Sequence, residues 1–233
     1  MLVVSIGNTN ARFGWFDGAD LVESEAISTA SLKKAPPRLE DGWGATIVSV
    51  VPEATEALAR AWGDRPLRIL NADSAGIPVD YHPRQAIGAD RLANAIALLD
   101  RGLAPGIAVD CGTATTFTVV DARGHVVGGA IAPGLGTAAR ALVGKTAQLR
   151  HVPYVRKPEP WGQDTITNLQ LGMVEGHVGM IAHLVARMRE GLGSEAPALL
   201  CGGWAETLQA GLPGFMCVPF LTLEGARLFG SKG

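Results

Sequence analysis

The chain has 233 residues, of which 47% are hydrophobic and 18% charged, so it can bury a sizeable core and is not expected to be disordered. Its net charge of -2 excludes the basic footprint of a protein that binds nucleic acid or an anionic membrane. No apolar run predicts a membrane helix, and residues 2–6 are too short for a signal-peptide core. Three widely spaced cysteines, Cys111, Cys201 and Cys217, favour a reduced, cytoplasmic protein.

The first hundred residues predict a β-hairpin followed by a strand–helix–strand unit. Strands are expected at residues 2–6, 11–16 and 21–24, with Asp17-Gly18 as the tight turn between the last two. The polar stretch that holds Lys33, Lys34, Pro36 and Pro37 predicts a loop. ATIVSVVP (45–52) predicts a buried strand, PEATEALARAW (52–62) a helix and PLRILNAD (66–73) a short strand, and such a crossover builds parallel sheet.

The remaining residues predict a second hairpin and several helices. A helix is expected from Ala89, and GIAVDCGTATTFTVVDARGHVVGGAIAPG (106–134) predicts strand, glycine turn, strand, hairpin and strand. Further helices are expected at roughly 137–149 and at 164–191, with a proline-containing loop over 151–163 between them. ALLCGGW (198–204) predicts a strand and a glycine turn, followed by a short helix and a helical tail, LTLEGARLFG (221–230).

Two of these segments look like copies of one unit. VVSIGNTNARFGWFDGADLVES and AVDCGTATTFTVVDARGHVVGG align at an offset of 105, which pairs Ser5 with Asp110 and Trp15 with Val120. A one-residue slip then pairs Asp17 with Asp121. The alternative is that both are unrelated strand–turn–strand pieces.

Each copy has the composition of a phosphate-binding turn. Backbone N–H groups in turns opened by Gly7 and Gly112 can bind nucleotide phosphates. Threonine hydroxyls add donors in both copies (Thr9, Thr113, Thr115 and Thr116). A carboxylate at the strand end can hold a cation, and the second copy has Asp110 where the first has Ser5.

Motifs along nearly the whole chain resemble those of type III pantothenate kinases. They are IGNTN (6–10), SVVP (49–52), YHPRQAIGADRLANAIA (81–97), DCGTATTFTVVD (110–121) with GGAIAPG (128–134), and DTITNLQLG (164–172). GADR followed about twenty residues later by DCGTATT is the most specific pair. The resemblance implies the fold of acetate and sugar kinases, Hsp70 and actin: an α/β protein of two ribonuclease-H-like domains, 1–100 and 101–233, each with mixed sheet, flanking helices and one phosphate loop.

The resemblance also implies a function, a cofactor set and a site. The expected reaction is ATP-dependent phosphorylation of pantothenate, the first step toward coenzyme A, by a cytoplasmic homodimer that uses Mg²⁺ and a monovalent cation, K⁺ or NH₄⁺. Asp90 is the implied general base, and Asp110 the implied ligand of the monovalent cation. The implied substrate-binding residues are Tyr81, Gly88, Ala89, Asp90, Arg91 and Thr165. The implied ATP-binding residues are Ser5, Ile6, Gly7, Asn8, Thr9, Asn10, Ala11, Arg12 and Thr113.

Each of these roles has a structural alternative. An acid such as Asp90 in the first turn of a helix also favours the helix dipole, and Arg91 can be a surface cation. Arg91 next to the acid equally suits the pantothenate carboxylate, which needs a charge-assisted partner. Tyr81 can pack on the core and Thr165 can be an ordinary early-helix residue. Arg12 is either an exposed strand residue or a phosphate contact.

Ser5 departs from the family pattern, in which the first loop begins with aspartate, D-x-GNT. Losing one preorganised electrostatic contact costs roughly 3 kcal/mol in a transition state, about a hundredfold in rate. Three outcomes are open: an active but slower enzyme, an enzyme in which Asp110 or Asp90 replaces the missing acid, or a catalytically impaired homologue that binds pantothenate or nucleotide as a regulatory accessory protein. A kinase for another hydroxyl substrate is a further alternative.

Overall fold

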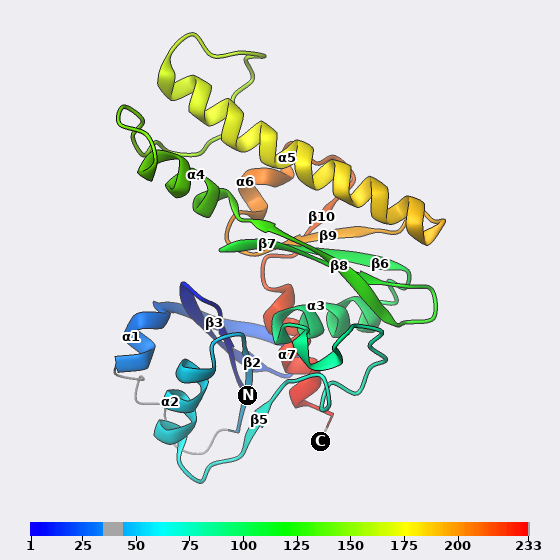
Figure 1. Ribbon diagram of the computed structural model, residues 1–233. Coiled ribbons are helices and arrows are strands. Elements are labelled where there is room, and N and C mark those ends of the chain that lie inside the picture. The colour runs from blue at the N-terminus through cyan, green and yellow to red at the C-terminus, as the bar shows by residue number, and fades with distance from the viewer. Residues whose placement is uncertain (35–43, 233) are drawn as a thin grey trace. The chain divides into compact units, whose positions relative to one another are not determined.

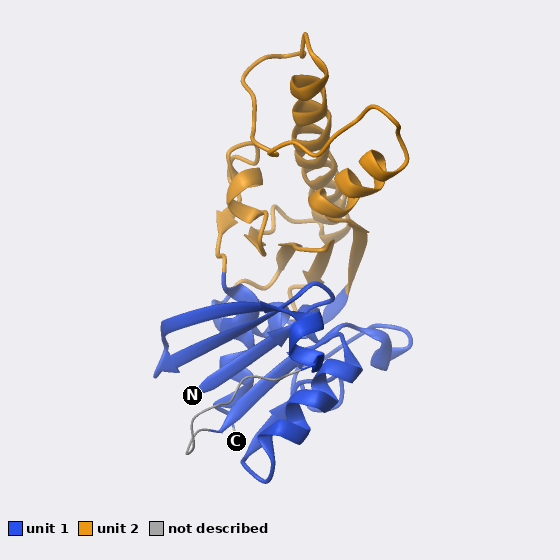
Figure 2. Cartoon of the chain, turned by 90° about the vertical axis from the view of Figure 1, so that its left-hand side faces the viewer, with its two compact units in different colours: residues 1–102, 124–127, 220–233 blue, residues 103–123, 128–219 orange. Residues whose placement is uncertain are grey.

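The computed structural model describes residues 1–34 and 44–232, and these form two compact units (Figure 2). Unit 1 comprises residues 1–102, 124–127 and 220–233, and unit 2 comprises residues 103–123 and 128–219. The first break, after Gly102, lies close to the expected boundary at residue 100, whereas the C-terminal segment is counted with unit 1. Within the described ranges, no helix combines the length and apolar character needed to cross a bilayer.

The sheet of unit 1 has five strands in the order β3-β2-β1-β4-β5 (Figure 1). Their bounds are β1 Leu2–Ile6, β2 Asn10–Asp17, β3 Asp20–Ser28, β4 Ala45–Ser49 and β5 Leu67–Ile69. β1 pairs antiparallel with β2 and parallel with β4, and β4 pairs parallel with β5, as the strand–helix–strand pattern predicted. The expected tight turn after Asp17 is present, with Gly18 at a φ of +57° that favours glycine.

Helices cover both faces of this sheet. Side chains alternate along β1, so Leu2, Val4 and Ile6 join a buried cluster with Leu58 and Trp62 of α2 (Pro52–Trp62). The other face packs against α7 (Leu221–Gly230), which also lies along α3 (Ala89–Asp100). These two helices approach so closely that a Cβ atom on Gly225 would lie 1.8 Å from the carbonyl oxygen of Ala93. The C-terminal helix therefore forms part of the core of unit 1.

The expected loop around Lys33 and Lys34 is wrong, because both residues lie in a short helix, α1 (Thr29–Lys34). The Ser28 hydroxyl accepts a hydrogen bond from the Ser31 N–H (3.0 Å), which caps the new helix, and Leu32 is fully buried in the core. Lys33 pairs with Glu53 of α2 (2.6 Å). Pro36 and Pro37 lie outside the described residues.

The sheet of unit 2 has the order β10-β9-β6-β7-β8. Its strands are β6 Gly106–Cys111, β7 Ala114–Val120, β8 Val126–Pro133, β9 Ala198–Cys201 and β10 Met216–Cys217. Its helices are α4 Leu135–Gly144, α5 Thr165–Leu192 and α6 Ala205–Gln209. Val109 of β6 and Phe117 of β7 join Val178 and Ile181 of α5 in one buried cluster, so the long helix covers one face of the sheet (Figure 1).

The helix expected at roughly 137–149 begins and ends earlier than predicted, at Leu135 and Gly144. After Gly144, the Lys145 N–H donates to the carbonyl of Leu142 (3.2 Å), and the Thr146 N–H donates to the carbonyl of Val143 (3.3 Å). The Thr146 hydroxyl also donates to the carbonyl of Leu142 (3.0 Å). These bonds satisfy the last carbonyl groups of the helix and end it. The long helix predicted at 164–191 is confirmed, with Asp164 as its N-cap.

The two sheets have the same strand order and directions, which supports the internal repeat. In each, a first strand pairs antiparallel with the second and parallel with the fourth. The turn after β1 spans residues 7–10 (the first turn), and the turn after β6 spans residues 112–114 (the second turn). Because the second turn is one residue shorter, the one-residue slip in the repeat alignment occurs at this turn. Trp15 pairs with Leu2, and Val119 pairs with Ile107 at the equivalent place. Trp15 therefore corresponds to Val119 rather than to Val120.

Candidate functional site

The segment before α3 is held in place by backbone contacts within unit 1. The Asp80 N–H donates to the carbonyl of Val126 (2.9 Å), and the Arg84 guanidinium donates to the carbonyl of Ala72 (3.0 Å). A short 3₁₀ helix, η1 (Arg84–Ala86), then leads to the buried side chain of Ile87. The chain enters α3 in a defined position, which fixes the residues of its first turn.

Asp90 is a partly buried acid at the start of α3. Its Oδ1 accepts the N–H of Arg91 (2.8 Å), and a Cβ atom on Gly88 would lie 2.4 Å from that oxygen. Burial raises the pKa of the Asp90 carboxyl, and the N–H and charge of Arg91 oppose this rise without cancelling it. The helix-dipole interaction is present as well, because the acid accepts an N–H of the first turn of α3.

Arg91 is not a surface cation, since its side chain is only 4% exposed. Its guanidinium carbon lies 5.2 Å from the centre of the Tyr81 ring. This is a cation–π distance, and such contacts gain strength where water is excluded. The structure thus brings together three predicted substrate residues, Tyr81, Asp90 and Arg91, around the start of α3.

The first turn presents polar residues at the end of β1. Asn8, Thr9 and Asn10 are exposed, and the N–H of Gly7 donates to the carbonyl of Asn10 (2.9 Å). Ile6 and Ala11, both predicted to contact ATP, are almost fully buried in the core, so only their backbone groups are suited to such a contact.

Ser5 and Arg12 face each other across the β1–β2 pair, so their side chains lie on the same face of the sheet. Arg12 also lies over the ring of Phe220, 5.4 Å from its centre. The position of the missing carboxylate is therefore next to a guanidinium, and Arg12 is the one charged residue in the segment 5–12.

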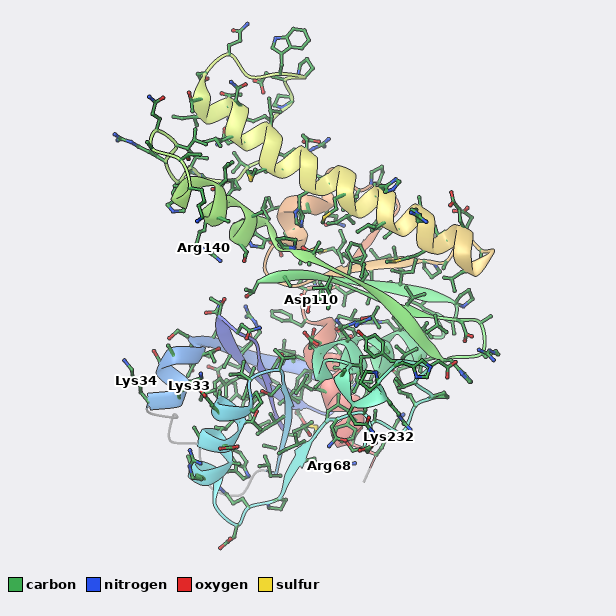
Figure 3. The ribbon with its side chains drawn as sticks, viewed as in Figure 1. Lys33, Lys34, Arg68, Asp110, Arg140 and Lys232 are labelled. Atoms are coloured by element: carbon green, nitrogen blue, oxygen red, sulfur yellow. The ribbon has the colours of Figure 1, made fainter. Side chains whose placement is uncertain are left out.

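Asp110 lies near the end of β6, just before the second turn (Figure 3). A Cβ atom on Gly202 would lie 2.4 Å from Asp110 Oδ1, and one on Gly112 would lie 3.5 Å away. The carboxylate therefore rests against backbone that bears no side chains. Burial, together with the charge of Asp110, raises the pKa of the neighbouring Cys111 thiol to about 12, so this thiol stays protonated.

Thr113 and Thr165 come from different elements of unit 2. Thr113 lies in the second turn, where its carbonyl accepts the N–H of Gly134 (3.1 Å). Thr165 is the exposed first residue of α5, next to the N-cap Asp164, whose carboxylate accepts the N–H and the hydroxyl of Thr167 (3.0 and 2.7 Å). These bonds lower the pKa of the Asp164 carboxyl and fix the start of the helix.

Two threonines that contact the turns were missed by the sequence analysis. The Thr29 hydroxyl donates to the carbonyl of Gly7 (2.6 Å), and the Thr137 hydroxyl donates to the carbonyl of Thr113 (2.7 Å). Neither pair is close in sequence. The aligned repeat segments end at Ser24 and Gly129, before both threonines, so the sequence patterns held no signal for these contacts.

Comparison with known sequences gives one family. A family model described as type III pantothenate kinase matches residues 1–187. A type III pantothenate kinase from Thermomicrobium roseum is 38% identical, with 97% of this chain and 95% of the relative covered. One from Moorella thermoacetica is 34% identical, with 98% and 97% covered.

Comparison with solved structures supports the fold. A Campylobacter jejuni protein described as a Baf family transcriptional activator aligns with a TM-score of 0.69 at 18% identity, covering 98% of this chain and 96% of that one. An inorganic polyphosphate/ATP-glucomannokinase from Arthrobacter sp. strain KM aligns with a TM-score of 0.51 at 14% identity, covering 100% and 99%. The matching strand orders and these alignments identify two ribonuclease-H-like domains. From the family model and the near full-length relatives, this chain belongs to the type III pantothenate kinase family.

Proposed function

We propose that this protein transfers the terminal phosphoryl group of ATP to the hydroxyl of pantothenate, giving 4'-phosphopantothenate, the first step of coenzyme A biosynthesis. The observation that carries the proposal is the partly buried Asp90 with a raised pKa, beside the buried Arg91 and the Tyr81 ring. An acid and a cation side by side match a substrate that has a reacting hydroxyl and a carboxylate.

Asp90 accepts the proton of the pantothenate hydroxyl and orients its oxygen toward the phosphorus. Phosphoryl transfer depends mostly on positioning and electrostatic stabilisation, so a base needs only modest strength. A carboxyl pKa raised by burial is closer to neutral pH than an ordinary one, which favours proton transfer in the transition state.

Arg91 binds the pantothenate carboxylate through charge-assisted hydrogen bonds, and stacking on Tyr81 holds its guanidinium in place. Gly88 brings the backbone close to the acid, and a Cβ atom at that position would displace the Asp90 carboxylate. Ala89 and Thr165 complete the proposed substrate set. Burial of the guanidinium strengthens its selection for an anionic group over a neutral one.

The first turn and Thr113 bind the ATP phosphates through backbone N–H and hydroxyl groups. ATP brings a divalent metal, Mg²⁺, which neutralises phosphate charge when bound. Asp110 holds a monovalent cation, K⁺ or NH₄⁺. The residues present fit this role, because Gly112 and Gly202 leave room beside the carboxylate that side chains would fill. Within the described part of the chain there is no cluster of three acidic, histidine or cysteine ligands, so other ligands would be phosphate, backbone and water.

We infer that Ser5 is compatible with activity. Relatives that align over nearly the whole chain are named as kinases, and no observation specifically favours the impaired, regulatory alternative. Arg12 beside Ser5 adds a positive charge where phosphate charge must be neutralised.

The proposed enzyme is a homodimer, and exposed apolar side chains of unit 2 such as Ile131, Trp161 and Ile166 (67%, 69% and 56% exposed) are available for a subunit contact. All three cysteines are free, which fits a cytoplasmic enzyme.

The test is phosphorylation of pantothenate by the purified protein with ATP, Mg²⁺ and K⁺. Asp90→Asn keeps the size of the side chain and is expected to lower kcat by about 10²–10⁴-fold. Asp100→Asn, an exposed acid at the other end of α3, is the matched control and is expected to match the wild type. A wild-type rate no higher than that of Asp90→Asn contradicts the proposal. If only Ser5→Asp is active, the impaired alternative holds instead.

A further inference from the structure

In each unit, the segment that follows the third strand of the sheet is hydrogen-bonded to the turn between the first and second strands. After β3, the N–H of Thr29 donates to the carbonyl of Thr9 (2.9 Å). After β8, the N–H of Gly134 donates to the carbonyl of Thr113 (3.1 Å). Thr9 and Thr113 are equivalent, since each precedes the residue whose carbonyl closes its turn. The same backbone bond therefore occurs in both copies of the repeat.

A threonine hydroxyl adds a second bond to each turn. Thr29 Oγ1 donates to the carbonyl of Gly7 (2.6 Å), and Thr137 Oγ1 donates to the carbonyl of Thr113 (2.7 Å). The Thr113 carbonyl can only accept, so the Thr137 hydroxyl donates this bond. The oxygen of the same hydroxyl accepts a hydrogen bond from Nη2 of Arg140 on α4 (3.3 Å; Figure 3).

The hydroxyl of Thr29 is not needed to begin α1. The Ser28 hydroxyl caps α1 through the N–H of Ser31 (3.0 Å), so the hydroxyl of Thr29 is available for the first turn. Thr29 is only 2% exposed, and a buried hydroxyl is retained where it has a partner to satisfy. Its hydroxyl has such a partner in the carbonyl of Gly7, which is part of the first turn.

We propose that Thr29 and Thr137 are positioning residues for nucleotide binding, an inference that rests on the proposed function. Carbonyl dipoles that turn toward a phosphate repel it, whereas N–H groups attract it. By holding the carbonyls of Gly7, Thr9 and Thr113, the two segments after β3 and β8 keep the turns in the orientation that presents N–H groups to the phosphates. The threonines act through the turns and do not touch ATP.

The experiment compares Thr29→Val and Thr137→Val with Thr29→Ser and Thr137→Ser. Valine keeps the shape and removes the donor, whereas serine keeps the donor. Each valine variant is expected to raise KM for ATP about tenfold, which corresponds to about 1.4 kcal/mol, while KM for pantothenate stays within twofold. Each serine variant is expected to return to within threefold of the wild type.

Thr55→Val is the matched control, because the Thr55 hydroxyl donates to the carbonyl of Val51 (3.1 Å) at the start of its own helix, α2, and not to either turn. It is expected to leave both KM values unchanged. If the valine variants lower the melting temperature but leave KM for ATP unchanged, or if the serine variants fail to recover, the threonines are structural only and the proposal is overturned.

Calorimetric titration with MgADP, in the absence of pantothenate, separates this inference from the proposed function. Weaker MgADP binding in the valine variants supports the positioning role even if the wild type does not phosphorylate pantothenate. Equal MgADP affinity in wild type, valine and Thr55→Val variants overturns it even if the wild type is an active pantothenate kinase.

Discussion

The contact between α3 and α7 gives a sharp test of how the fold positions the catalytic acid. Gly225 of α7 faces the carbonyl of Ala93, and a Cβ atom at this position would lie 1.8 Å from that oxygen and 2.5 Å from its carbon. Ordinary contacts of this kind exceed 3 Å, and the obstacle is helix backbone, which cannot rotate away. Gly225→Ala must therefore separate the two helices by about 1 Å or more.

The expected cost follows from three contributions. Overpacking costs about 1–3 kcal/mol, and the backbone obstacle favours the upper part of that range. Stretching the nearby bond from Thr222 to Asn94 (2.9 Å) adds about 1 kcal/mol. The better helix propensity of alanine returns up to about 1 kcal/mol. The net loss is about 2–3 kcal/mol of unfolding free energy, which lowers the melting temperature by roughly 4–12 °C for a chain of this size.

The same shift acts on Asp90, which lies one turn before Ala93 on α3. A displacement of about 1 Å at a reacting group costs up to 10²-fold, so kcat/KM for pantothenate is expected to fall about 10–100-fold. Urea unfolding and steady-state kinetics measure the two effects. Gly179→Ala is the control: Gly179 lies exposed in α5 with no atom near its Cβ position, and alanine there should stabilise by about 0.5–1 kcal/mol without changing kcat/KM. If Gly225→Ala behaves like Gly179→Ala in both assays, the argument fails.

Further predictions concern charges of the proposed site. Burial raises the pKa of folded Asp90, so the fold loses stability as pH rises from the carboxyl's ordinary pKa to this higher value. Asp90→Asn should melt no lower than the wild type at pH 8, with its advantage shrinking in acid; a lower melting temperature at pH 8 contradicts the sign. Ser5→Asp should lower the Mg²⁺ concentration that gives half-maximal rate, because a carboxylate adds a ligand beside Arg12; an unchanged Mg²⁺ titration argues against this. Asp164→Ala removes two hydrogen bonds at the start of α5 and should raise KM for pantothenate more than KM for ATP, through Thr165; equal changes would count against a substrate role there.

Local patterns predicted most elements because the information lay within a few neighbouring residues. The apolar run of β1, the glycine turn after Asp17 and the cap of α5 at Asp164 are all signals of this kind. The α1 helix was missed because its decisive contact is burial of Leu32, and six residues with two lysines show no helical stripe.

Contacts between distant residues were not predictable from such patterns. The hydrogen bond from Thr222 to Asn94 joins α7 to α3 across 128 positions, so the C-terminal helix was expected in the second domain, whereas the structure counts it with unit 1. The same limit applies to Thr29, whose partner Gly7 lies 22 positions away. In contrast, Tyr81 and Arg91 were expected to act together through motif resemblance, and the structure brings their side chains into contact.

The same hydrogen-bonded turn has a positive charge beside it in the first copy and a negative charge beside it in the second. Equivalent hydrogen bonds close both turns, from Gly7 to Asn10 and from Gly112 to Ala114. Within the segments 5–12 and 110–116, the only charged residues are Arg12 in the first and Asp110 in the second. The positive charge of Arg12 beside the first turn suits the phosphates themselves, and the negative charge of Asp110 beside the second turn suits a cation that accompanies them. Under the proposed function, Ser5 in place of the family's aspartate leaves the first copy with the positive charge of Arg12, while the second copy keeps the negative charge of Asp110.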